Sequence, residues 1–146
     1  MIEVSSLLHR AGAAEGFLVP ALSGKVFHIQ ESSEGSRDWT AQEVIRITGK
    51  KVSGWEMPEL GGLVTDIQVS GDDRYLYLTN WSHGEVRQYD ITQPARPRLS
   101  ALLTLGGTIY AGAAVEAESD QPRLRYIKDK MISGSPHQLR LSPDGE

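Results

Sequence analysis

Four short runs of strand-forming residues follow one another through the middle of the sequence. They cover residues 65–70, 74–80, 85–91 and 98–105, and Gly, Asp, Ser or Pro residues separate them. Alternating β-branched, aromatic and polar side chains favour strands with one buried face, and turns this short join antiparallel neighbours. The segment therefore predicts a four-stranded meander, which is the unit of a propeller blade.

The same pattern recurs on both sides of this segment. Residues 139–145 repeat the type and order of residues 67–73, and residues 6–12 form a weaker copy that is followed by runs at 16–22, 25–30 and 40–47. Repeated meanders without long helical segments predict an all-β partial β-propeller. We expect one propeller domain with a blade at 1–49, a second blade at 50–107, and an insertion plus the first strand of a third blade at 108–146.

The expected third blade has only its first strand and turn before the last residue. A sheet that ends there leaves an unpaired edge, which folded proteins usually avoid. We therefore expect the chain to be a fragment of a larger propeller or the product of a truncated reading frame. Such a fragment is expected to be marginally stable, to associate through its edge strands and to be inactive on its own.

Composition excludes several classes of function. The 146 residues include 15 Lys and Arg against 19 Asp and Glu, a net charge of -4, which argues against general binding to nucleic acids or anionic membranes. No apolar run is long enough to span a membrane. The absence of cysteine excludes disulfides, Cys-ligated zinc, iron–sulfur clusters and a thiol nucleophile in this sequence. P-loop, GxSxG, HExxH and EF-hand motifs are also absent.

The N-terminal residues do not read as a secretory leader. Residues 1–8, MIEVSSLL, have no basic segment before a long apolar run. The cytoplasm is therefore the default expectation. A periplasmic location stays open if a leader lies upstream of these residues.

Blade geometry places some polar residues on a common rim. In a meander, the start of the first strand and the turn between the second and third strands lie at the same end of the sheet. By this count Thr65, Asp66, His83 and His137 share one rim, whereas His9 falls on the opposite rim. His28 lies in the middle of a strand and is expected to be structural, as is His9.

Several motifs between residues 49 and 107 occur together in one known family. Residues 50–55 read KKVSGW, residues 57–59 MPE and residues 62–67 GLVTDI; the most specific stretch is NWSHGEVRQYDI at 80–91, followed by RPRL at 96–99 and LGG at 105–107. In this order they resemble the selenium-binding protein family, whose bacterial members include methanethiol oxidases. The resemblance extends more loosely towards both ends.

The sequence also departs from the family pattern. It has Arg10-Ala11-Gly12 where family members usually have Asn-Pro-Asp, Pro20 where a Cys is frequent, and His137 where Gln is common. The family cysteine associated with selenium lies upstream of the matched region. Selenium binding through a thiolate is therefore not supported for this Cys-free chain.

The resemblance implies a seven-bladed propeller of which this chain is about a third. It also implies a copper-dependent oxidase that converts methanethiol, O2 and water to formaldehyde, hydrogen sulfide and hydrogen peroxide, so the implied cofactor is copper and the implied partner is a small thiol. The alternative is a non-catalytic propeller that binds selenium compounds, thiols or protein partners, since a fold does not determine a function. No catalytic residue can be assigned from the sequence.

Three residues are candidates for a metal site. His83 is the first, because a neutral imidazole is a good copper ligand; the alternative is a hairpin-turn histidine before a glycine with positive φ. His137 is a second candidate ligand, with an exposed loop histidine as the alternative. Asp66 could hydrogen-bond a ligand histidine from behind, or it could cap the loop that contains Trp55 and Glu59.

The large aromatic residues are expected to fill the space between blades. This interpretation applies to Trp55, Trp81, Tyr75, Tyr77 and Tyr89. Aromatic side chains bury large areas and commonly dominate such interfaces.

Overall fold

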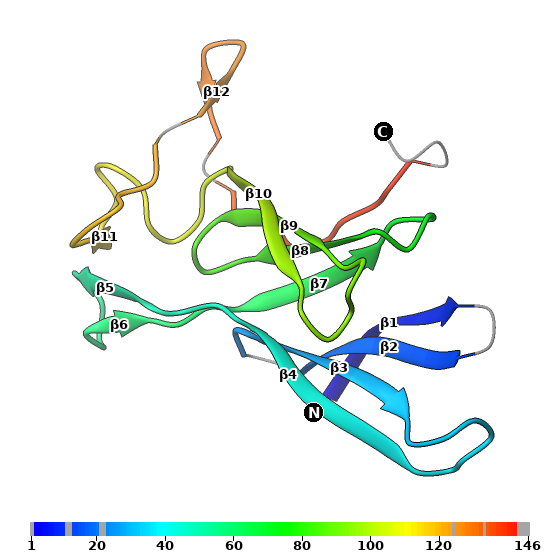
Figure 1. Cartoon of the computed structure of the whole chain (residues 1–146). Helices are drawn as coiled ribbons and strands as arrows, with labels where there is room; N and C mark the ends of the chain where they lie inside the picture. The colour runs from blue at the N-terminus through cyan, green and yellow to red at the C-terminus, as the bar shows by residue number, and fades with distance from the viewer. Residues whose placement is uncertain (1, 11–12, 21–22, 124, 133, 143–146) are drawn as a thin grey trace.

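Two four-stranded antiparallel sheets form most of the structure (Figure 1). The computed structural model describes residues 2–10, 13–20, 23–123, 125–132 and 134–142, with side chains from residue 14 onwards. The first sheet contains β1 (Ile2–Arg10), β2 (Ala13–Pro20), β3 (Lys25–Glu31) and β4 (Trp39–Arg46). The second contains β7 (Val64–Val69), β8 (Tyr75–Asn80), β9 (Glu85–Asp90) and β10 (Arg98–Thr104). In each sheet, neighbours in sequence are neighbours in space.

Turn chemistry explains why the second sheet forms as a meander. Between β7 and β8, the Asp72 carboxylate accepts hydrogen bonds from the Ser70 hydroxyl and the Arg74 amide, and Asp73 adopts a φ of 57°. Between β8 and β9, Gly84 adopts a φ of 68°, which glycine reaches at little cost. These hydrogen bonds and the positive φ values stabilise the two turns, and both hairpins form as the sequence predicted.

One hydrophobic core joins the two sheets. The strands of both sheets, and the residues directly after β4 and β9, contribute fully or nearly fully buried side chains: Phe17, Val19, Val26, Ile45, Ile47, Val64, Ile67, Leu76, Leu78, Tyr89 and Ile91. Burying each large aliphatic side chain contributes about 1.5–3 kcal/mol, so this shared core is the main force that holds sheet against sheet. The innermost strands β1 and β7 contact each other. The architecture is thus all-β and that of an open, partial propeller.

A small third sheet covers one end of the second sheet. It consists of β5 (Lys50–Ser53), β6 (Glu59–Leu60) and β11 (Glu116–Ala117), in the order β11-β5-β6. Val52, Leu60, Ile109 and Val115 form its own buried cluster. The sequence did not predict this sheet. It brings Leu60 to the β8–β9 turn and thereby encloses that turn.

The chain after β10 contains little regular structure. A two-stranded hairpin of β12 (Tyr126–Ile127) and β13 (Lys130–Met131) projects from the body of the molecule (Figure 1). Residues 134–142 carry no assigned strand, yet the Leu139 amide donates to Asp66 Oδ2 at 2.8 Å and the Thr79 hydroxyl donates to the His137 carbonyl at 3.2 Å. Side chains of β7 and β8, rather than a backbone ladder, therefore hold this segment against the second sheet. The turn expected at 143–145 lies outside the described residues.

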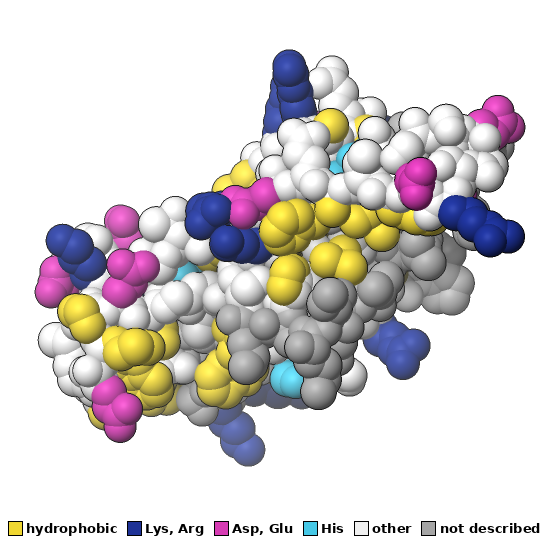
Figure 2. Space-filling view, turned by 90° about the horizontal axis from the view of Figure 1, so that it is seen from below, with side chains coloured by type: hydrophobic (Ala, Val, Ile, Leu, Met, Phe, Trp, Pro, Cys, Tyr) yellow, Lys and Arg dark blue, Asp and Glu magenta, His cyan; other side chains and the backbone are white. Residues whose placement is uncertain are grey.

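Burial of the aromatic residues differs from expectation at two positions. Tyr89 is buried in the shared core, but Trp81 is 39% exposed and Trp55 45% exposed, so neither tryptophan packs a blade as predicted among the described residues. Trp81 lies in the β8–β9 turn and Trp55 follows β5, where neither sheet covers them. Hydrophobic side chains are visible in several patches of the surface in Figure 2. Over the described residues, no helix has the length and apolar character needed to cross a membrane.

Candidate functional site

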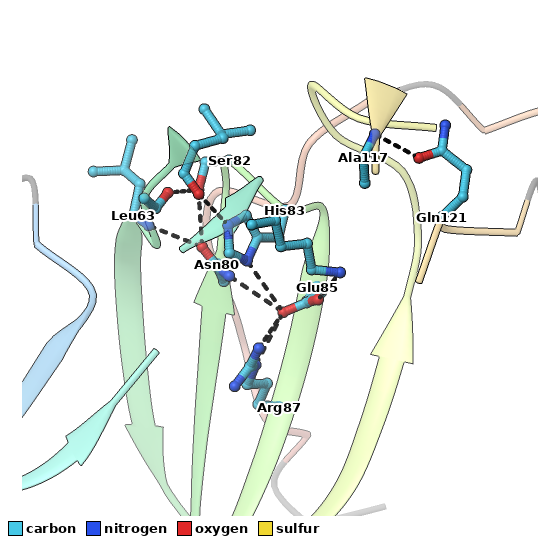
Figure 3. A network of polar contacts seen from close by, with 11 residues as sticks. Leu63, Asn80, Ser82, His83, Glu85, Arg87, Ala117 and Gln121 are labelled. Atoms are coloured by element: carbon cyan, nitrogen blue, oxygen red, sulfur yellow. Dashed lines mark hydrogen bonds and ion pairs between the residues drawn. The ribbon is translucent and has the colours of Figure 1, made fainter. Parts of the chain in front are cut away.

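His83 lies completely buried in the turn between β8 and β9 (Figure 3). Its Nε2 atom is 2.8 Å from the carbonyl oxygen of Leu60, which β6 supplies. Its Nδ1 atom is also buried and has no hydrogen-bond partner; the nearest carboxylate oxygen, Glu85 Oε2, is 3.9 Å away. A buried polar atom without a partner is uncommon in folded proteins and points to a functional or structural reason.

The protonation state of His83 follows from its surroundings. Burial lowers the pKa of His83, and this effect outweighs the opposing influence of the Leu60 carbonyl and the Glu85 charge. The ring is therefore neutral near pH 7 and carries a single N–H. Because a carbonyl can only accept, Nε2 holds that hydrogen and donates it to Leu60. Nδ1 is left with a free lone pair.

Glu85 forms the charged centre beside this ring. The side chain is only 2% exposed, and its two oxygens meet two cations: Oε1 lies 3.3 Å from Lys50 Nζ, while Oε2 accepts from Arg87 Nη2 at 2.7 Å and Nε at 3.0 Å. Asn80 Nδ2 donates to Oε2 at 3.2 Å. Burial alone would raise the pKa of Glu85, but the charge and hydrogen bonds of Arg87, together with Lys50, hold that pKa below its ordinary value.

Strand geometry explains how these side chains meet. Glu85 and Arg87 are two positions apart on β9 and therefore share one face of the sheet. Asn80 on β8 is the register partner of Glu85, so it reaches the same carboxylate. The other end of the Asn80 amide, Oδ1, accepts from the Leu63 amide at 2.9 Å and lies 3.1 Å from Ser82 Oγ. The network thus links the ends of β8 and β9 to the segment that leads into β7.

The structure separates the predicted site residues into two groups. Asp66 and His137 lie close to one another. The Asp66 carboxylate accepts from the amide of Leu139, two residues after His137, and the His137 carbonyl accepts from Thr79, the register partner of Asp66. The Asp66 carboxylate binds the Leu139 amide instead of a histidine or the loop with Trp55. No described hydrogen bond or ion pair connects His83 with either residue. The metal roles of His83 and His137, and the supporting role of Asp66, stay predictions.

The remaining histidines differ in setting. His28 is buried on β3, with Nε2 3.0 Å from Glu15 Oε2 and its ring 5.5 Å from the ring of Phe17, which agrees with a structural role. His9 pairs through its backbone with Ala14 on β2. Glu85 is the important residue that sequence reasoning missed. The signal was available, since Glu85 and Arg87 alternate on one predicted strand directly after His83.

The donor set around His83 fits one position of a metal site. Nδ1 has a free lone pair, and the opposite ring nitrogen donates to a backbone carbonyl, which is how metal-ligating histidines are commonly oriented. Glu85 is a poor ligand here because Arg87, Lys50 and Asn80 already occupy its oxygens. Within the part of the chain that the structure describes, no group of three His, Cys, Asp or Glu side chains could hold a metal ion. His83 could therefore contribute one ligand to a site that other groups complete.

Comparison with known proteins agrees with the motifs around this site. The sequence model described as 56kDa selenium binding protein (SBP56) matches residues 1–146. The chain belongs to the selenium-binding protein family. It is 43% identical over 144 residues to a methanethiol oxidase of Mus musculus and 44% identical to one of Homo sapiens, covering 95% of this chain and 30% of each relative. Selenium-binding protein 2 of Mus musculus is 43% identical with the same coverage.

A solved structure supports the same family assignment. The chain matches the X-ray structure of a hypothetical selenium-binding protein from Sulfolobus tokodaii with a TM-score of 0.58 and 32% sequence identity. The match covers 72% of this chain and 25% of that protein. The chain spans about 30% of the length of the curated relatives it matches.

Proposed function

We propose that the protein is a copper-dependent methanethiol oxidase, with His83 as one of its copper ligands. The observation that carries the proposal is the buried, neutral imidazole of His83, whose Nε2 donates to Leu60 while Nδ1 keeps an unused lone pair. Relatives that share about 43% of its residues are named methanethiol oxidase. The stretch around His83, NWSHGEVRQYDI at 80–91, is also the one that resembles the family most specifically. The activity belongs to the complete propeller; the chain spans about 30% of the length of these relatives.

The chain's own residues prepare His83 for this role. The Leu60 carbonyl fixes the ring orientation and the tautomer, and burial keeps the imidazole neutral so that the lone pair on Nδ1 stays free. Lys50 and Arg87 offset the negative charge of Glu85, and their own positive charges also favour the neutral form of the ring. Copper would supply the one-electron chemistry that a reaction between a thiol and O2 requires.

The reaction gives three products in equal amounts, and this provides the test. One methanethiol, one O2 and one water yield one formaldehyde, one hydrogen sulfide and one hydrogen peroxide. We expect the copper-loaded protein, in the longest form that its gene encodes, to release all three in a 1:1:1 ratio from methanethiol. His83→Asn is expected to abolish this release, whereas His28→Asn, at a second buried histidine, is expected to retain most of it. Equal activity in the two variants would contradict the proposal.

A non-catalytic binding scaffold is the second candidate. Three leucines of the outer strand β10 are 41–51% exposed: Leu99, Leu102 and Leu103. Leu99 and Leu102 lie opposite Tyr89 and Arg87 and share one face of the sheet, whereas Leu103 lies on the other. Exposed apolar side chains on an outer strand favour contact with another protein surface. If this function is the correct one, the copper-loaded protein forms none of the three products, and replacing these leucines by serine weakens association without changing the fold.

A further inference from the structure

Glu85, the charged neighbour of His83, also borders a cationic pocket. Its volume is about 520 Å³, and side chains of three elements line its floor: Glu85 and Arg87 of β9, Leu102 and Thr104 of β10, and Lys50 of β5. The opposite wall follows β11 in the chain and consists of Asp120, Gln121, Pro122, Arg123 and Arg125. His83 does not line this pocket, so the pocket is distinct from the candidate metal position.

The opposite wall is held in place by hydrogen bonds. The Ala117 amide donates to Gln121 Oε1 at 2.7 Å, a contact visible in Figure 3. Arg125 Nε donates to the carbonyl oxygen of Thr104 on β10. The first bond holds Gln121 against β11, and the second holds Arg125 against β10. The side chains of Arg123 and Arg125 border the pocket.

The charges that line the pocket do not balance. Glu85 is shared by Lys50 and Arg87, and all three are at least partly buried. The side chains of Arg123 and Arg125 are exposed and form no ion pair with any described residue; the same holds for Asp120, the other acid of the pocket. Four cationic side chains therefore face two acidic ones, in a protein whose net charge is -4.

We propose that this pocket binds a dianionic phosphate or sulfate group. Two guanidinium groups without an ion pair match the geometry of such a group. Arg123 can present paired N–H donors to two oxygens, and Arg125, whose Nε binds the Thr104 carbonyl, can do so with its two terminal nitrogens. The excess of two positive charges matches a dianion better than a carboxylate. The volume exceeds that of an inorganic ion, and Leu102 and Pro122 provide apolar surface for an organic substituent. A small organic phosphate or sulfate is therefore the class of ligand that the pocket accommodates.

Titration with inorganic phosphate tests this inference on the full chain. Amide and side-chain resonances of Gln121 and Thr104 are followed by NMR near pH 7.5, at constant ionic strength maintained with sodium chloride. We expect saturable shifts at millimolar phosphate, similar shifts with sulfate, and weaker binding of acetate. The double variant Arg123→Gln/Arg125→Gln removes both of these charged donors and is expected to raise the dissociation constant by about tenfold or more, a loss of about 1.4 kcal/mol or more.

Two further variants give the test a sign and a control. Asp120→Asn removes the unpaired acid of the pocket and is expected to tighten phosphate binding by about two- to threefold. Arg37→Gln removes one positive charge at an exposed position in the β3–β4 loop, half of the charge that the double variant removes, and is expected to leave binding unchanged. No saturable shift, binding of acetate as tight as that of phosphate, or an equal loss with Arg37→Gln would overturn the inference.

Discussion

The buried position of Glu85 leads to a quantitative prediction for stability. Glu85→Gln keeps the shape of the side chain but removes the charge that Lys50 and Arg87 share. Removing one partner of a buried ion pair costs about 3–5 kcal/mol, because the remaining charge is left uncompensated. The side chains of Lys50 and Arg87 are 23% and 16% exposed, so water solvates part of that charge and we expect the lower end, about 3 kcal/mol.

A second glutamate provides a matched control in the same chain. Glu43 also contacts one arginine and one lysine, since Oε1 accepts from Arg46 Nε at 2.7 Å and Oε2 lies 3.6 Å from Lys25 Nζ. Its side chain is 27% exposed, in contrast to the 2% of Glu85. Exposed ion pairs of this kind contribute about 0–1 kcal/mol, so Glu43→Gln is expected to cost less than about 1 kcal/mol.

Urea unfolding followed by tryptophan fluorescence measures both variants. With an m value of about 2 kcal/mol/M, Glu85→Gln lowers the midpoint by about 1.5 M and Glu43→Gln by less than about 0.5 M. Because the folded-state pKa of Glu85 is lowered, its contribution is present above the ordinary value of 4.5 and is lost as the pH falls through the folded value. The gap between wild type and Glu85→Gln should therefore narrow below about pH 4.5. Equal costs for the two glutamates, or a gap that is independent of pH, would refute the reasoning.

Three further predictions concern single elements. Gly84→Ala places a methyl group against a backbone carbonyl of the segment after β10, at a residue with a positive φ, and should lower the free energy of unfolding by more than about 2 kcal/mol. Gly35 has a similar φ but open space around it, so Gly35→Ala should lower it by about 1 kcal/mol. The same urea assay measures both. Asp66→Ala removes the acceptor for the Leu139 amide and should lower its hydrogen-exchange protection about tenfold, while strand β8 keeps its protection. Burial lowers the pKa of His83, so its contribution to the free energy of unfolding is present above pH 6.5 and is lost as the pH falls below that value. Between about pH 6.5 and 5, the melting temperature should therefore fall less for His83→Phe than for wild type. An equal fall in the two proteins would contradict this assignment.

The regular strands could be predicted because their signals are local. The run at 85–91 alternates side chains and follows a turn with Gly84, and the structure has β9 at Glu85–Asp90. The run at 25–30 likewise became β3, Lys25–Glu31. Hairpin pairing needs only neighbouring residues, so period and turn chemistry are sufficient. The all-β, blade-like fold was therefore available from the sequence.

The small sheet and the burial of His83 could not be predicted in the same way. β11 pairs with β5 across a long separation, with Glu116 opposite Ser53, and strands of two residues carry no periodic signal. This sheet brings Leu60 over the turn and makes His83 a fully buried residue instead of a rim residue open to solvent. Local pattern predicted the turn and the positive φ of Gly84, but not what covers the turn.

Metal content tests the central claim most directly. Wild type, His83→Asn and His28→Asn are loaded with copper, desalted and analysed for copper per chain, in the longest form of the protein that the gene encodes. The account predicts that wild type and His28→Asn retain copper, whereas His83→Asn loses most of it, because among the described side chains only the His83 ring has a buried nitrogen without a partner. Copper retained equally by the two variants, or absent from wild type, would contradict the assignment of His83 as a copper ligand.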